Sequence, residues 1–353
     1  MKDRIKELMP GMLITFFIAL ISFITWWLLK SSWLKFSALL WAFIYSLIAI
    51  NVKPALFEKQ SRPGIEFASS RLLRWSIAAL GLTVSASVWV QLGGAGLAMV
   101  LINLAIVFSL GLLFCKYVLK MDDALTILIS VGTSICGASA IAAVGPAVRA
   151  KAEQMGLAVA AITLFGLIAM FAYPFLFNSV LSGWLGNNPL AYGMWVGTGV
   201  HETAQVIAAG SQVDGAVSIA TSAKFIRIFM IGPMVIVSLL VFSKFVGAEK
   251  KEKIKITIPW FAVFFIIFTL VNLGLSSLPF RDIWISVNNT YLSPIVTFLL
   301  AWSFAGIGLK VKFSTIRFIG LKAFMGGIAV AIVAGVTSLL LVKFLWMPLS
   351  GLG

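Results

Sequence analysis

Charged residues are scarce in this chain of 353 residues: Asp, Glu, Lys and Arg together make up 11%, against about 25% in an ordinary soluble domain. A water-soluble protein of this size could not cover its surface with so few charges. Only two cysteines are present, and 61% of the residues are hydrophobic, so a disulfide-rich scaffold and a disordered chain are also excluded. What remains is a polytopic membrane protein.

Acidic residues are the rarest charged class, with 12 against 27 Lys and Arg, and the formal net charge is +15. This excess does not indicate a nucleic-acid partner. The basic residues lie mostly between apolar segments, where they set the orientation of membrane helices.

The apolar residues form long segments, each close to the roughly 20 residues that a helix needs to cross a bilayer. The segments fall near 11–29, 33–50, 74–90, 95–115, 123–147, 156–177, 189–210, 214–242, 256–275, 284–308 and 318–342. The sequence therefore predicts an all-α polytopic membrane protein with about eleven membrane segments. It forms a single transmembrane domain over residues 1–353, without a soluble domain.

Basic residues are concentrated in three loops, 51–73, 243–255 and 310–317. If the segments alternate in direction, all three loops lie on one side, which the positive-inside rule identifies as cytoplasmic. The N-terminus is then cytoplasmic too. The basic residues of these loops are Lys53, Lys59, Arg62, Arg71, Lys244, Lys250, Lys251, Lys253, Lys255, Lys310, Lys312 and Arg317.

Two segments, 123–147 and 189–210, carry glycine and hydroxyl residues in the middle of an apolar run. The first contains Gly132-Thr133-Ser134-Ile135-Cys136-Gly137-Ala138-Ser139, and the second contains Gly197-Thr198-Gly199-Val200-His201-Glu202-Thr203-Ala204. Glycine frees the backbone, and Ser and Thr can bond groups that a broken helix leaves unpaired. We expect each segment to consist of two half-helices that meet at an unwound point.

The two interrupted segments also resemble each other at an offset of 65 residues. Gly132, Thr133, Ala143 and Gly145 match Gly197, Thr198, Ala208 and Gly210. The match indicates an internal repeat with halves 72–177 and 189–309. Repeats with interrupted helices are typical of secondary transporters, which bind substrate where the half-helix ends meet.

Two topologies fit this repeat. If both interrupted segments span the membrane, they run parallel, and Arg149 and Lys151 lie outside. If both are re-entrant hairpins, one enters from each side, and the same two cations lie inside. The second topology obeys the positive-inside rule better and makes the repeat an inverted one, so we favour it.

Lys224 and Arg227 are the cations that lie deepest in an apolar segment, roughly 15–20 Å past Asp214 along a helix. Their spacing of three residues puts them on one helix face. Cations at this depth should face a cavity or a partner. One interpretation is an anion-binding site. The other is a structural pair neutralised by Glu202 or by carbonyls at a half-helix C-terminus.

His201 is the only histidine, and Glu202 follows it in the second interruption. Because histidine titrates near neutral pH, this pair could couple transport to protons or contact the substrate. Alternatively, both side chains hold the unwound backbone. The run His201 to Gln205 superficially resembles the zinc-binding HExxH helix, but Gln205 replaces the second histidine, and no metal site is expected.

Polar and small residues beside the two interruptions complete the predicted substrate-binding site. They could bind an anion together with the free N–H groups of half-helix N-termini, although helix packing is the commoner role for each hydroxyl. The predicted set is Thr133, Ser134, Cys136, Gly137, Ser139, Thr198, Gly199, His201, Glu202, Thr203, Gln205, Lys224 and Arg227.

The motifs Gly132 to Ala143 and Gly197 to Val206, with Lys224-Phe225-Ile226-Arg227, resemble the YeiH-type family of bacterial membrane proteins. The resemblance covers about Leu72 to Leu309. Members are usually labelled sulfate exporters. The family is similar to a wider group of cation/proton antiporters and bile-acid-type symporters with inverted repeats. The resemblance implies a location in the bacterial inner membrane.

We therefore expect a secondary transporter of a small anion, sulfate or a sulfonated compound, that works by alternating access. The partners are the anion and the lipid bilayer, and no cofactor is expected. A cation- or proton-coupled carrier of another organic solute is the alternative. An enzyme would need a metal or a nucleophile, and neither is evident. Substrate identity, transport direction, coupling ion and oligomeric state, a homo-oligomer included, stay open.

Overall fold

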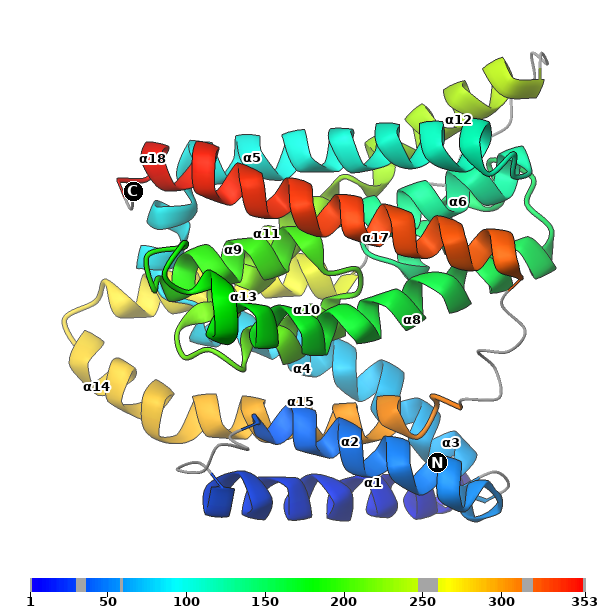
Figure 1. The fold of residues 1–353 in the computed structure, drawn as a ribbon. Helices are drawn as coiled ribbons and strands as arrows, with labels where there is room; N and C mark the ends of the chain where they lie inside the picture. Colours follow the sequence, from blue (N-terminus) through cyan, green and yellow to red (C-terminus); the bar gives the residue numbers. More distant parts are fainter. Residues whose placement is uncertain (1, 30–35, 58–59, 247–259, 313–319, 352–353) are drawn as a thin grey trace. The chain divides into compact units, whose positions relative to one another are not determined.

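The computed structural model describes residues 2–29, 36–57, 60–246, 260–312 and 320–351, and the regular secondary structure in these ranges is helical throughout (Figure 1). Five helices are long and apolar enough to cross a membrane, or six if the bent pair Ala216–Phe229 and Ile231–Val246 is one span. The five are Lys6–Leu29, Ser87–Val118, Ala152–Leu181, Arg281–Gly308 and Leu321–Leu349. The class of an all-α polytopic membrane protein is confirmed, while the count of eleven segments stays a prediction.

Part of the predicted loop pattern lies outside the described residues. The starts of the predicted segments 33–50, 256–275 and 318–342 lie there too. The basic loop residues concerned are Lys59, Lys250, Lys251, Lys253, Lys255 and Arg317.

The chain divides into two compact units that alternate along the sequence. Unit 1 comprises Met1–Ala86 and Trp260–Thr315, and unit 2 comprises Ser87–Pro259 and Ile316–Gly353. All the site residues predicted from the sequence belong to unit 2.

Unit 1 is built from helices that approach closely at glycines. A Cβ on Gly308 would lie 2.6 Å from the Cβ of Ser46, and one on Gly64 would lie 2.1 Å from the carbonyl of Leu8. Its elements are α1 (Lys2–Leu29), α2 (Ala38–Val52), η1 (Pro54–Phe57), α3 (Arg62–Glu66), η2 (Phe67–Leu72), α4 (Leu73–Leu80), η3 (Gly81–Thr83), α13 (Trp260–Ser276), α14 (Arg281–Val287), η6 (Asn288–Leu292) and α15 (Ser293–Gly308).

The predicted segment 74–90 is not one helix. Helix α4 ends at Leu80, and Val84 is extended with ψ 114°. Two asparagines replace the missing helical hydrogen bonds. Asn272 Nδ2 donates to the Val84 carbonyl at 2.8 Å, and Asn288 Nδ2 donates to the Leu82 carbonyl at 2.6 Å. These bonds satisfy backbone groups that the end of the helix leaves unpaired.

Unit 2 contains both interrupted segments, and the predicted interruptions are confirmed. Its elements are α5 (Ala86–Leu113), η4 (Phe114–Val118), α6 (Asp123–Ser134), α7 (Ala138–Val144), α8 (Ala152–Leu176), η5 (Phe177–Leu181), α9 (Pro189–Gly199), α10 (Thr203–Gly210), α11 (Ala216–Phe229), α12 (Ile231–Val246), α17 (Leu321–Leu341), η7 (Val342–Trp346) and α18 (Met347–Leu349). Helices α6 and α9 end 65 residues apart, and α7 and α10 begin 65 residues apart. The breaks therefore coincide at the offset seen in the sequence.

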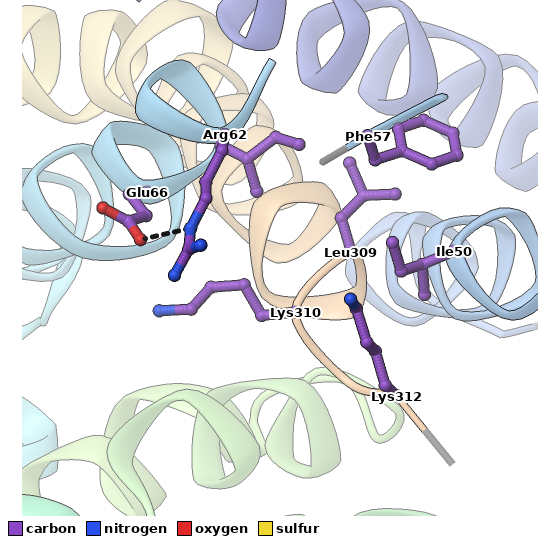
Figure 2. Close-up of a pocket in the computed structure, with 8 residues that line it drawn as sticks. Ile50, Phe57, Arg62, Glu66, Leu309, Lys310 and Lys312 are labelled. Carbon is purple, nitrogen blue, oxygen red and sulfur yellow. Dashed lines mark hydrogen bonds and ion pairs between the residues drawn. The ribbon is translucent and has the colours of Figure 1, made fainter. Parts of the chain in front are cut away.

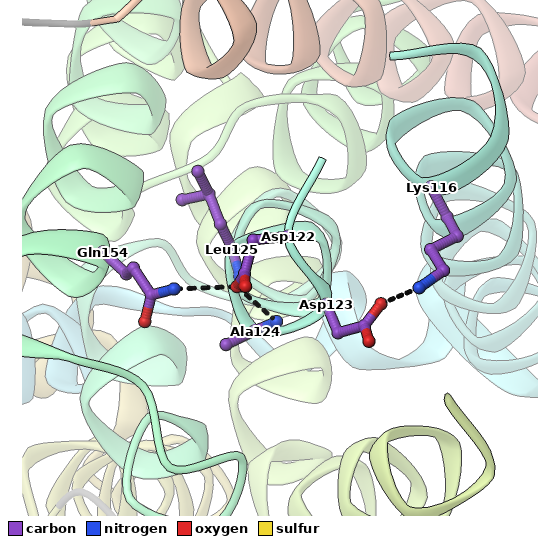
Figure 3. Close-up of polar contacts among 6 residues, drawn as sticks. All are labelled: Lys116, Asp122, Asp123, Ala124, Leu125 and Gln154. Atoms are coloured by element: carbon purple, nitrogen blue, oxygen red, sulfur yellow. Dashed lines mark hydrogen bonds and ion pairs between the residues drawn. The ribbon is translucent and has the colours of Figure 1, made fainter. Parts of the chain in front are cut away.

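The first hairpin, α6 and α7, returns to the end at which it begins. Asp122 caps α6 by accepting hydrogen bonds from the N–H groups of Ala124 and Leu125. The same carboxylate accepts a hydrogen bond from Nε2 of Gln154 at 2.7 Å, in the first turn of α8 (Figure 3). Because α8 starts beside the start of α6, the chain returns to the end of unit 2 from which α6 starts. Lys116 pairs with Asp123 at the same end.

The second hairpin, α9 and α10, also returns to the end at which it begins. Tyr192 near the start of α9 donates to the carbonyl of Ala209 at the end of α10, at 2.8 Å. A Cβ on Gly193 would lie 2.6 Å from the carbonyl of Ala216, the first residue of α11. Helix α11 therefore starts beside the start of α9.

Helix α8 connects the two hairpins. It has 25 residues, a length of about 37 Å, and its far end packs on the start of α9 through the Phe177–Tyr192 ring contact at 4.7 Å. The two hairpins therefore start at opposite ends of unit 2 and meet at their breaks. This arrangement is the one expected of the re-entrant topology, and the orientation in the membrane stays a prediction.

Candidate functional site

The breaks of the two hairpins lie against each other inside unit 2. A Cβ on Gly137 in the first break would lie 2.6 Å from Cγ of Glu202 in the second. Helix α11 runs past both breaks and carries the two deep cations. We call this region the crossing: residues 133–139, residues 198–205, Lys224 and Arg227.

Lys224 joins the two breaks through its ammonium group. Its Nζ donates to the carbonyls of Ile135 at 2.7 Å and Val200 at 2.9 Å, and to the carbonyl of His201. The side chain is fully buried. An ammonium has three N–H donors, so these three carbonyls use all of them.

Arg227 joins the same two half-helix ends one turn further along α11. On the first hairpin, Nε donates to the Ser134 carbonyl at 2.9 Å and Nη2 to the Thr133 carbonyl at 2.6 Å. On the second hairpin, Nη1 donates to the carbonyls of Thr198 at 2.7 Å and Gly197 at 3.1 Å. This side chain is also fully buried.

Both cations therefore lie at the C-terminal ends of α6 and α9, where carbonyls are left unpaired and the helix dipole is negative. This geometry matches the structural interpretation of the pair, neutralisation by half-helix carbonyls.

Glu202 and Gln205 form the N-terminal cap of α10. The Glu202 N–H donates to Oε1 of Gln205 at 3.1 Å, and the Glu202 carboxylate accepts a hydrogen bond from Oγ1 of Thr163 at 3.1 Å. Gln205 Nε2 in turn donates to the Thr163 carbonyl at 3.2 Å. The first turn of α10 is therefore already occupied by the carboxylate of Glu202, at the helix end where the dipole favours a negative charge.

Two side chains of the crossing have buried polar atoms without a hydrogen-bond partner among the described residues. These atoms are Oγ1 of Thr133 and both ring nitrogens of His201, whose side chain is 1% exposed. A buried polar group left unsatisfied costs about 1–3 kcal/mol, so such atoms mark positions where water or a bound solute would be stabilised. One residue comes from each break.

The other predicted site residues differ in their hydrogen bonds and in their exposure. Ser134 and Thr198 use their hydroxyls inside their own helices, bonding the carbonyls of Val131 at 3.2 Å and Met194 at 2.6 Å. Cys136 is a buried free thiol, and Ser139 is exposed. Thr203 is partly buried, and Gly199 packs against the Tyr173 hydroxyl. All thirteen predicted residues lie in or directly beside the crossing.

Sequence reasoning missed a second layer of polar residues around the crossing. Thr163 on α8 holds Glu202 and Gln205. Asn103 on α5 donates to the Thr198 carbonyl at 2.9 Å and accepts a hydrogen bond from Thr337 on α17 at 2.8 Å. Asn103 could have been identified from the sequence, because an amide in the middle of an apolar segment needs polar partners.

Among the described residues, no group of three or more His, Cys, Asp or Glu side chains is placed to hold a metal ion.

The fold and the crossing define the class: a polytopic membrane protein with two interrupted helical hairpins. Residues 10–327 match a family model described as "Conserved hypothetical protein 698". The chain is 34% identical to the inner membrane protein YeiH of Salmonella typhi, over 83% of this chain and 82% of that protein. It is 32% identical to YeiH of Escherichia coli K12, over 90% and 84%. A UPF0324 membrane protein of Pseudomonas aeruginosa is 34% identical over 90% and 89%.

The chain therefore belongs to the UPF0324 family, which includes the YeiH membrane proteins, and the resemblance found in the sequence is confirmed. No solved structure matches the chain.

Proposed function

We propose that this protein is a secondary transporter of a small anion and that the crossing is its binding site. The observation that carries the proposal is the charge of the crossing. Two fully buried cations, Lys224 and Arg227, are accompanied by one carboxylate, Glu202. The two half-helix C-termini contribute about −0.5 each and the two N-termini about +0.5 each, so these cancel. A net charge of about +1 remains, which an anion would neutralise.

The direct contacts to the anion come from other groups than the cations. Lys224 and Arg227 donate to backbone carbonyls, and Glu202 occupies the first turn of α10. Thr133 Oγ1 and the His201 ring are buried groups of the crossing that have no partner among the described residues, and both can donate a hydrogen bond. Sulfate and sulfonates present several acceptor oxygens that suit two such donors from opposite breaks.

The proposed transport cycle uses the two hairpins and the crossing. In the proposed cycle, the crossing would be reached along one hairpin from each end of unit 2. We propose that the hairpins are copies in an inverted repeat and that movement of the bundle that carries them opens the crossing to alternate sides. His201 and Glu202 would couple this movement to protons. The protein would lie in the bacterial inner membrane, with a cytoplasmic N-terminus, and would act as a carrier and not as an enzyme.

The test is a ligand panel on the purified protein. A solute that binds only the folded state increases the free energy of unfolding, by about 2.7 kcal/mol at 100 times its Kd, and therefore raises the melting temperature. We expect sulfate or methanesulfonate to raise it, and Thr133→Val to reduce that response severalfold without changing the ligand-free melting temperature.

Thr126→Val is the matched control, because Thr126 lies on the same helix α6 and its buried Oγ1 also has no partner among the described residues. It lies two turns before the crossing and should leave the response unchanged. Equal responses in both variants would contradict the proposed site.

A cation- or proton-coupled carrier of another organic solute is the second candidate. The observation in its favour is that the hydrogen bonds of Lys224 go to carbonyls and not toward an open position. It predicts a melting temperature that responds to sodium or pH and not to the identity of the anion.

A further inference from the structure

Unit 1 contains a cavity of about 540 Å³ that the proposed transport site does not use. It lies between the end of α2, the start of α3 and the residues that follow α15. One wall is apolar and consists of Ile50, Phe57, Ile65 and Leu309. The other wall is charged and consists of Arg62, Glu66 and Lys310, and Lys312 also lines the cavity. Figure 2 shows Arg62, Glu66 and Lys310 on one side and Ile50, Phe57 and Leu309 on the other, with Lys312 near Ile50.

The charged wall favours an anion. Among the described residues that line the cavity, Glu66 is the one carboxylate, and the cations are Arg62, Lys310 and Lys312, of which Lys312 has a further interaction of its own. Arg62 and Lys310 come from parts of the chain that are far apart in the sequence. Arg62 and Glu66 form an ion pair at 3.3 Å, but their side chains are 73% and 54% exposed. Such an exposed pair contributes little to stability, so an incoming anion can take the place of Glu66 on Arg62 at small cost.

The apolar wall favours a chain attached to that anion. Ile50, Ile65 and Leu309 are only 2–3% exposed, and they form one cluster with Phe57, supported by Ile14 and Ile18 of α1. The cavity therefore has a rigid apolar side directly beside a cationic side. A free inorganic anion would use only the second of these.

We propose that this cavity binds the phosphate head group of an anionic phospholipid, with the phosphate on Arg62 and Lys310 and the first part of an acyl chain against Leu309 and Phe57. The positive-inside rule assigns both loops to the cytoplasmic side, where juxtamembrane basic pockets meet anionic head groups. The site is separate from the crossing, so either proposal can fail without the other.

The experiment measures binding of fluorescent phosphatidylglycerol to the full-length protein held in phosphatidylcholine nanodiscs. We expect Arg62→Gln and Lys310→Gln each to weaken binding about 5-fold and the double variant about 30-fold, since each basic residue near an anionic head group contributes about one such factor. Both side chains are exposed, so the variants should keep the wild-type melting temperature in phosphatidylcholine.

Arg281→Gln is the matched control, because Arg281 is also an exposed arginine of unit 1 paired with a carboxylate, that of Asp282 at 3.5 Å. It should bind the lipid like the wild type. Equal loss in Arg281→Gln, or no loss in the double variant, would overturn the site. Competition by inorganic phosphate as strong as by unlabelled phosphatidylglycerol would overturn the lipid assignment and make free phosphate the occupant.

Discussion

Glu202 occupies the space that a side chain on Gly137 would need. A Cβ at Gly137 would lie 2.6 Å from Cγ of Glu202, and the backbone of Gly137 has φ +74°. The glycine is required twice, once for a left-handed backbone at the break and once for the approach of the second hairpin. Gly137, which breaks the first hairpin, therefore also leaves room for Glu202, which caps α10 in the second hairpin.

The first prediction concerns this contact. Gly137→Ala should lower the free energy of unfolding by about 2–3 kcal/mol, because alanine is strained at this φ and collides with Glu202. Thermal unfolding in detergent measures the change. Gly156→Ala in α8 is the matched control, since a Cβ there meets no atom within 4 Å and alanine favours a helix. If both variants melt at the wild-type temperature, the close packing of the two breaks is wrong.

The second prediction separates the structural role of Arg227 from a role in binding. Arg227→Met removes five hydrogen bonds to carbonyls at the ends of α6 and α9, so we expect a loss of about 3–5 kcal/mol of stability, with solute binding lost as a consequence. Arg281→Met, at an exposed position, should change stability by less than about 0.5 kcal/mol. An Arg227→Met protein that melts like the wild type but no longer binds the anion would show that Arg227 serves the substrate alone.

The third prediction concerns the sides from which the hairpins enter the membrane. A cysteine at Ala150, directly after the first hairpin, should react with a membrane-impermeant maleimide from the cytoplasmic side, because the hairpin returns to the end that carries Lys116 and Lys120. A cysteine at Ser182, between α8 and α9, should react from the opposite side. The native Cys115 and Cys136 are buried and should give little background. Labelling of each position from the other side would favour two fully spanning segments.

The positions of the two helix breaks were predictable because their signals are local. Glycine and hydroxyl clusters inside an apolar run identify a broken helix, and Gly132 and Gly197 were visible as a pair at one offset. The side from which the first hairpin starts was also suggested, since Arg149 and Lys151 follow the positive-inside rule only if that hairpin returns.

Half-helix carbonyls were one of the two partners expected for the deep cations, but the particular carbonyls were not predictable in the same way. Lys224 and Arg227 bond carbonyls of residues about 90 positions earlier and about 25 positions earlier, and a carbonyl acceptor has no signature in a sequence. Unpaired backbone groups exist only once the breaks are formed. The end of α4 inside segment 74–90 was missed for a related reason, because its compensating amides come from Asn272 and Asn288, far along the chain.

The last prediction uses Glu202 to distinguish the two candidate functions. Glu202→Gln keeps an oxygen acceptor for Thr163 and for the N-terminus of α10, so the protein should stay folded, with stability within about 1 kcal/mol of the wild type. The substitution removes the one carboxylate of the crossing and raises its net charge from about +1 to about +2.

An anion carrier should then bind sulfate or a sulfonate several times more tightly, measured as the concentration that gives half of the maximal rise in melting temperature. A cation- or proton-coupled carrier should instead lose its response to sodium or pH. Glu202→Ala is the companion variant, since it removes both the charge and the cap and should cost about 1 kcal/mol more in stability than Glu202→Gln. Loss of the anion response in Glu202→Gln, at unchanged stability, would contradict the charge argument on which the proposed function rests.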